Sequence, residues 1–137
     1  MILRSPGGKQ KASRFLHSLA PLSYAEYREP FVGSAGMLWR IPVSKTIWIN
    51  DLNPGIMNVW DQLRNGDDRF VEQMVTLVQE DEILSEKERR EKFEYYKQIY
   101  CNTNDGLAYW YVNRNSQCAV VSRQRKGIAT FTLKMDN

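Results

Sequence analysis

The sequence predicts an α/β fold in which strands and helices alternate at first, followed by a mainly helical region that ends in a β-hairpin. Residues 24–31 and 45–52 have the composition of strands, and each runs into turn residues followed by a helical pattern. Residues 54–114 then have helical spacing, and residues 119–133 alternate apolar and polar side chains around Lys126-Gly127. A length of 137 residues suits one domain with one ordinary core.

The first expected element is a short amphipathic helix over residues 13–20. Phe15, Leu16 and Leu19 have helical spacing, and Pro21 ends the run. This helix should therefore precede the first strand.

The two expected strands both end beside turn residues. Residues 24–31 alternate aromatic and polar side chains before a proline and a glycine, and residues 34–40 resume a helical pattern at once. Residues 45–52 contain a mostly apolar run that ends in Asn50-Asp51. The order is therefore strand, helix, strand, and then the helix that follows.

The helical region begins at Pro54, since proline suits the first position of a helix. Ser85 and Glu88 form a capping-box pattern, in which a serine and a glutamate three residues apart satisfy the free N–H groups of a helix start. The further helices are expected over residues 68–79, 87–100 and 105–114.

The composition and motifs of the sequence argue against membrane, secreted and metal-binding proteins. There is no long apolar stretch, no secretory signal, no metal-ligand spacing around Cys101 and Cys118, and the net charge is only +3. A cytoplasmic protein without membrane spans, disulfides or bound metal is expected. Basic residues form two clusters, which either meet phosphates or are ordinary solvated surface. The clusters are Arg4, Lys9, Lys11 and Arg14 near the start, and Arg114, Arg123, Arg125 and Lys126 near the end.

The glycine-containing turn after the first strand favours a nucleotide ligand. About twenty residues separate it from Asp51, which follows the second strand and can accept hydrogen bonds from ribose hydroxyls. The dinucleotide pattern G-x-G-x-x-G is absent, so an adenosine-containing ligand without a pyrophosphate fits better. The alternative interpretation is that the glycines only form an ordinary tight turn.

The combination of P-G-G-K, E-P-F-V-G-S-A-G and N-D-L-N-P, in this order and at these separations, closely resembles the start of the Dam-like adenine-specific DNA methyltransferases. The resemblance implies DNA methylation, as in restriction-modification enzymes, with S-adenosylmethionine as cofactor and double-stranded DNA as partner. It also implies an incomplete Rossmann-like S-adenosylmethionine-dependent methyltransferase fold over residues 1–56 and a helical target-recognition-like region over residues 57–137.

The same resemblance implies the cofactor-binding residues. In the family the first two motifs wrap the cofactor and the acidic residue of the third holds its ribose. Lys9 would then approach the methionine carboxylate, Phe31 and Gly33 would border the cofactor, and Asp51 would bind the ribose. Ser5 stands where the family usually has an aromatic residue, so one stacking contact is expected to be missing.

The resemblance continues more weakly past Arg64, where residues 108–131 are similar to a family segment. The family has an "LNR…RKG.F" segment there, and the positions that match it predict DNA contacts. Gln117, Cys118 and Ala119 replace the family's usual aromatic and glycine residues, and a simple helix end is the alternative for the first two matching positions. The expected DNA-contacting residues are Asn113, Arg114, Arg123, Arg125 and Lys126.

No catalytic residue is expected in this chain. The family holds the flipped adenine with an Asp-Pro-Pro-Tyr motif, and none of the five prolines here is adjacent to another. We therefore expect the N-terminal part of an adenine methyltransferase, inactive alone, with a second chain as the partner that supplies the rest of the catalytic domain. The alternative is a non-catalytic module that binds nucleic acid or the cofactor.

Overall fold

The chain mixes helices with a small parallel sheet, and it divides into two compact units that are described separately below. The computed structural model describes residues 2–66, 68–116, 122–123 and 129–130. Unit 1 is Met1–Leu52 and unit 2 is Asn53–Asn137. None of the helices in the described residues is long and apolar enough to span a bilayer.

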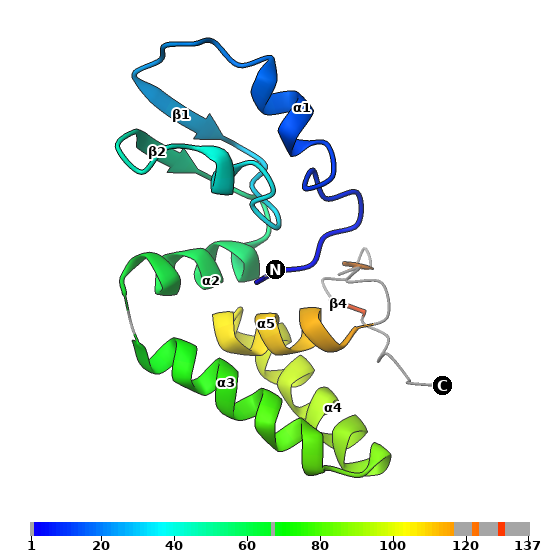
Figure 1. The fold of residues 1–137 in the computed structure, drawn as a ribbon. Coiled ribbons are helices and arrows are strands. Elements are labelled where there is room, and N and C mark those ends of the chain that lie inside the picture. The colour runs from blue at the N-terminus through cyan, green and yellow to red at the C-terminus, as the bar shows by residue number, and fades with distance from the viewer. Residues whose placement is uncertain (1, 67, 117–121, 124–128, 131–137) are drawn as a thin grey trace. The chain divides into compact units, whose positions relative to one another are not determined.

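Unit 1 is built around two parallel strands. Strand β1 (Glu26–Glu29) pairs with β2 (Thr46–Ile49), and the two run side by side in Figure 1. Helix α1 (Ser13–Ser18) precedes β1, and the short 3-10 helix η1 (Leu38–Arg40) lies between the strands in sequence. The expected order of these elements is confirmed, and both strand ends lead into the segments that the sequence singled out.

The expectation of a helix over residues 34–40 is wrong for most of its length, because only η1 is helical. The preceding residues form a tight turn in which Gly33 has φ +48° and Ala35 has φ +56°, a left-handed conformation that a helix cannot continue through. The Ala35 side chain is fully buried in this turn, at 0% exposure, and the neighbouring Gly36 packs against the backbone of Gln10. Helical spacing alone did not reveal the turn, because these contacts are with a distant segment of the sequence.

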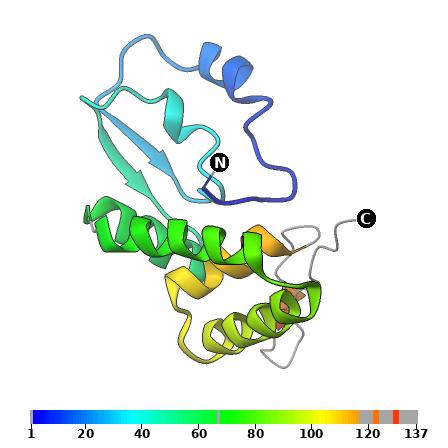
Figure 2. The same ribbon diagram turned by 60° about the horizontal axis from the view of Figure 1, so that its bottom comes forward.

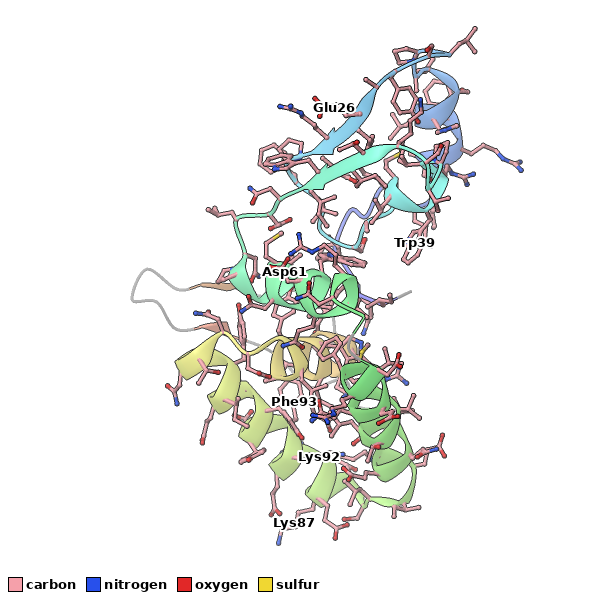
Figure 3. The ribbon with its side chains drawn as sticks, turned by 90° about the vertical axis from the view of Figure 1, so that its left-hand side faces the viewer. Glu26, Trp39, Asp61, Lys87, Lys92 and Phe93 are labelled. Carbon is pink, nitrogen blue, oxygen red and sulfur yellow. The ribbon has the colours of Figure 1, made fainter. Side chains whose placement is uncertain are left out.

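Apolar side chains remain exposed on the sheet of unit 1. Ile47 and Trp48 of β2 are 39% and 50% exposed, and Phe15 and Leu19 near α1 are also exposed. Trp39 of η1 is exposed as well and is labelled in Figure 3. Parallel sheets normally have both faces covered, so apolar side chains such as these are ordinarily buried.

In its described residues, unit 2 contains four helices arranged around the last of them. Figures 1 and 2 show α5 among the other three. Tyr109, Trp110, Tyr111 and Val112 of α5 are all buried, so the middle of this helix is enclosed by its neighbours. The four helices are α2 (Pro54–Arg64), α3 (Asp68–Ile83), α4 (Glu86–Thr103) and α5 (Gly106–Asn115).

The helix starts follow the capping rules that the sequence indicated. Asn53 accepts a hydrogen bond from the Gly55 N–H, with Pro54 at the first position of α2. The capping box of Ser85 and Glu88 is confirmed at the start of α4, with both reciprocal hydrogen bonds formed. Local sequence thus fixes where these two helices begin.

A polar network joins α3, α4 and α5 inside unit 2. Asp81 Oδ1 lies 2.9 Å from Lys92 Nζ and accepts a 2.9 Å hydrogen bond from the Tyr111 hydroxyl. Glu80 is also 2.9 Å from Lys92 Nζ. Figure 3 shows Lys92 beside the buried Phe93 on α4. Burial and the hydrogen bond to Asp81 raise the pKa of Tyr111, so it stays a neutral donor.

The expected β-hairpin is confirmed as far as its strands are described. Strands β3 (Ser122–Arg123) and β4 (Ala129–Thr130) are antiparallel, with Ser122 opposite Thr130 and Arg123 opposite Ala129. The turn that the sequence places at Lys126-Gly127 lies outside the described residues.

Candidate functional site

A pocket in unit 1 lies between two backbone segments, residues 5–9 and 31–36. Its volume is about 160 Å³, and its lining includes Ser5, Lys9, Phe31 and Gly33. These are four of the five positions that the resemblance assigned to a cofactor. The P-G-G-K segment and the turn after β1 are therefore brought together in space, although they are more than twenty residues apart in sequence.

Glycines allow the two segments to approach this closely. A Cβ atom added to Gly36 would lie 2.8 Å from the Gln10 nitrogen and 3.1 Å from the Lys9 carbonyl carbon. A Cβ added to Gly8 would lie 3.2 Å from the Ser34 hydroxyl oxygen. Because the obstacle at Gly36 is backbone, a side chain there would force the two segments apart.

Asp51, the fifth position, is linked directly to the turn. Its Oδ2 atom accepts a 2.9 Å hydrogen bond from the Gly33 N–H, and Asn50 O accepts one of 2.8 Å from the Val32 N–H. The Asn50 N–H in turn donates to Glu29 O at 2.9 Å. The carboxyl end of β2 and the turn after β1 thus form one hydrogen-bonded edge, which holds the Asp51 carboxylate beside the pocket-lining glycine.

The Lys9 ammonium is held at the pocket by two acceptors. Its Nζ lies 2.9 Å from Glu29 Oε1 and donates a 3.1 Å hydrogen bond to Phe31 O. The other oxygen of Glu29 accepts a 2.8 Å hydrogen bond from the Tyr27 hydroxyl. Burial and the hydrogen bond to Glu29 raise the pKa of Tyr27 above its ordinary value, so the phenol stays protonated.

Glu29 and Tyr27 were missed as site residues by sequence reasoning. Glu29 is 5% exposed, which is unusual for a carboxylate. The signal in the sequence is their spacing of two on a strand, which puts both side chains on the same face, together with a lysine in the nearby glycine segment.

Phe31 and Ser5 differ in what they offer the pocket. The Phe31 side chain is 73% exposed, so most of its ring is accessible at the pocket. The Ser5 hydroxyl donates a long 3.4 Å hydrogen bond to Pro6 O. The expected loss of a stacking contact at Ser5 stays a prediction.

Three of the residues predicted to contact DNA lie in the described part of the chain, two near the end of α5 and one in β3. Arg114 is exposed, and its guanidinium carbon lies 6.0 Å from the centre of the Trp110 ring. Asn113 is only 1% exposed, so its side chain points into unit 2. Arg123 belongs to β3, whereas Arg125 and Lys126 lie outside the described residues. A DNA role for these residues stays a prediction.

Comparisons with known proteins match residues 5–135 of the chain to the D12 class N6 adenine-specific DNA methyltransferases. A curated protein, the Type II methyltransferase M1.LlaDCHI of Lactococcus lactis subsp. cremoris, is 25% identical over 100 residues. That match covers 73% of this chain and 31% of the relative. The chain therefore spans about a third of the length of this relative.

Proposed function

Because the chain belongs to the family of D12 class N6 adenine-specific DNA methyltransferases, we propose that unit 1 is part of an S-adenosylmethionine-binding domain of the Rossmann-like type. The single observation that carries this proposal is the pocket between residues 5–9 and 31–36, with Asp51 bonded to its glycine turn. Residues 1–56 would form this partial catalytic domain and residues 57–137 the target-recognition-like region.

The residues present fit one part of the cofactor. Gly8 and Gly36 let residues 5–9 and 31–36 pack closely against each other, and the pocket lies between these two segments. A pocket of about 160 Å³ is smaller than the roughly 300–1,000 Å³ typical of ligand sites. We therefore expect weak binding to the chain alone, because part of the wall is not provided by these residues.

Each side chain has a chemical task in this proposal. The Asp51 carboxylate would accept hydrogen bonds from the ribose hydroxyls, and the Lys9 ammonium would donate to the carboxylate of the methionine part. The exposed ring of Phe31 would pack against a planar group of the ligand. When bound, S-adenosylmethionine supplies an electrophilic methyl group on its sulfonium.

We propose that this chain alone does not transfer that methyl group. Transfer to the exocyclic amine of adenine needs acceptors for the amine protons and a ring on which the flipped base can stack. The family places these groups in an Asp-Pro-Pro-Tyr motif that this sequence does not contain. Orientation of the base cannot be supplied by groups that are absent, so the bound cofactor would stay unreacted.

The exposed apolar side chains of the sheet support the proposal that further polypeptide, in the same or another chain, covers this sheet. Ile47 and Trp48 are exposed on a parallel pair, which is ordinarily covered on both faces. Such a segment would complete the sheet and enlarge the pocket.

DNA contact is proposed for the end of α5 and the hairpin region. Acidic residues outnumber basic ones over residues 53–116, so most of the helical surface repels phosphates. Arg114 lies at the end of this stretch, and the basic tail that contains Arg123, Arg125 and Lys126 follows it in the sequence. If these residues meet phosphates, DNA affinity falls steeply with rising salt and shows little sequence preference.

The proposed cofactor site is tested by titration calorimetry on the full chain with S-adenosylmethionine. Asp51→Asn keeps an acceptor for the Gly33 N–H and removes the charge, so affinity should fall by about 1.5–3 kcal/mol. The control is Asp61→Asn, since Asp61 is half-exposed on α2 beside Arg64. Equal affinity of wild type and Asp51→Asn would exclude this site.

Catalysis is tested separately, by incubating the chain with labelled cofactor and duplex DNA. We expect no label on DNA, and DNA binding that weakens with salt. Methyl transfer by this chain alone would refute the proposal of inactivity, and salt-independent binding would remove the role of the basic tail.

A further inference from the structure

We propose that Glu29 is a positioning residue, whose buried carboxylate holds the Lys9 ammonium at the pocket so that Lys9 can bind the carboxylate end of an adenosine-linked amino acid. This inference rests on the proposed cofactor function, because it concerns the amino-acid end of the same site. It assigns a role to Glu29 and, behind it, to Tyr27.

The contacts fix the carboxylate in one orientation. Oε1 of Glu29 lies 2.9 Å from Lys9 Nζ, while Oε2 accepts a 2.8 Å hydrogen bond from the Tyr27 hydroxyl. A rotation of the Glu29 carboxylate away from this position would lose at least one of the two partners. The backbone at Glu29 is fixed as well, since its carbonyl accepts the Asn50 N–H.

The ammonium keeps a donor for a ligand. A lysine ammonium has three protons, and within the described part of the chain Glu29 Oε1 and Phe31 O accept two of them. The Lys9 side chain is 45% exposed and lines the pocket, whereas the Glu29 side chain is 6% exposed. The buried partner thus holds the exposed one at the place where a ligand would enter.

Stability alone is a poor reason for this arrangement. Burying a carboxylate costs free energy, and an ion pair offsets this cost only when its geometry is very good. An apolar residue of similar size often stabilises a protein more. The partner here is a half-exposed lysine, whose pairing adds little because water screens it. What the pair does provide is a long, flexible side chain fixed before the ligand arrives.

The test compares two ligands that differ at the amino-acid end. S-Adenosylhomocysteine carries the carboxylate, whereas 5′-methylthioadenosine lacks the whole amino-acid part. Both are titrated into the full chain, followed by amide chemical shifts, for wild type, Glu29→Gln, Lys9→Met and the double variant. The control is Glu26→Gln, the same change on the same strand at a half-exposed residue that pairs with Arg28; Glu26 is labelled in Figure 3.

Glu29→Gln should weaken S-adenosylhomocysteine binding about threefold to tenfold. In this variant the Lys9 side chain is no longer held in place before binding, so its loss of conformational freedom reduces the affinity. Binding of 5′-methylthioadenosine should not change. The double variant should bind no more weakly than Lys9→Met, because Glu29 acts only through Lys9. Unchanged S-adenosylhomocysteine affinity in Glu29→Gln, or equal weakening for both ligands, would overturn the inference.

A second readout needs no ligand. The acylation rate of Lys9 by a succinimidyl ester, measured by mass spectrometry, should rise in Glu29→Gln and not in Glu26→Gln. If wild type binds neither ligand, the proposed cofactor function fails, and the acylation rate alone decides whether Glu29 holds Lys9. Equal rates in wild type and Glu29→Gln would then overturn the positioning role.

Discussion

Gly36→Ala tests whether the pocket depends on direct backbone contact between its two segments. The added Cβ would lie 2.8 Å from the Gln10 nitrogen and 3.2 Å from the Gln10 Cα, against the roughly 3.5–4.0 Å of an ordinary carbon contact. Backbone cannot rotate aside as a side chain can, so residues 9–10 must move by several tenths of an ångström. Overpacking of this kind costs about 1–3 kcal/mol.

The assay is amide hydrogen exchange in the turn, because its hydrogen bonds report local opening. The Val32 N–H donates to Asn50 O at 2.8 Å, and the Ala35 N–H donates to Val32 O at 2.7 Å. A loss of about 1.4 kcal/mol makes exchange about tenfold faster. We expect at least that change at Val32 and Ala35 in Gly36→Ala, together with weaker binding of adenosine ligands.

Gly7→Ala is the matched control for this substitution. Gly7 also has a restrictive conformation, with φ +68°, but an added Cβ would meet nothing within 4 Å. It should therefore carry only the cost of the left-handed conformation at its own position, and exchange at Val32 and Ala35 should stay near wild type. If Gly36→Ala changes neither hydrogen exchange at Val32 and Ala35 nor the amide chemical shifts of Lys9 and Gln10, the two segments do not depend on close backbone contact at Gly36.

Three further predictions concern unit 2. Gly55→Ala places a Cβ 2.5–2.6 Å from buried tyrosine rings, and overpacking of this kind costs about 1–3 kcal/mol. This cost should exceed the roughly 1 kcal/mol gained in helix propensity, so the variant should be less stable than wild type in urea unfolding. Asp81→Ala should cost about 2–3 kcal/mol in the same assay, because Lys92 and Tyr111 lose a shared, partly buried acceptor while Glu80 still pairs with Lys92. Hydrogen bonds from Ser85 lower the pKa of Glu88, so the capping box should stabilise the start of α4 above pH ~4.5. This stabilisation should be lost as the pH falls through the pKa of Glu88 in the folded chain. In Glu88→Gln, helix content measured by circular dichroism should depend less on pH.

Local rules in the sequence were sufficient for the helix starts and for the order of the strands. Pro54 and the Ser85–Glu88 pair act through hydrogen bonds to neighbouring backbone, so their effect can be predicted without the rest of the fold. The approach of the P-G-G-K segment to the turn after β1 was expected from the resemblance, since spacing alone left an ordinary tight turn open.

Other features depend on contacts between distant residues and could not be predicted from local patterns. Residues 34–40 have helical spacing, but Gly36 packs against Gln10 and the turn takes left-handed conformations, so only η1 is helical. Asn113 is only 1% exposed, and its burial depends on the packing of α5 against three other helices, which no local pattern around this residue indicates. Glu29 became a site residue only when the fold brought Lys9 to it.

The claim that residues 5–9, the turn after β1 and Asp51 form a cofactor site is tested most directly by mapping the bound ligand on the full chain. Amide shifts are recorded while S-adenosylmethionine is added to saturation. We predict that the largest changes occur at the pocket glycines Gly8, Gly33 and Gly36, and that Asp51→Asn weakens the titration without moving those signals in the free chain. Saturable changes confined to residues of unit 2, or none at any concentration, would contradict the account.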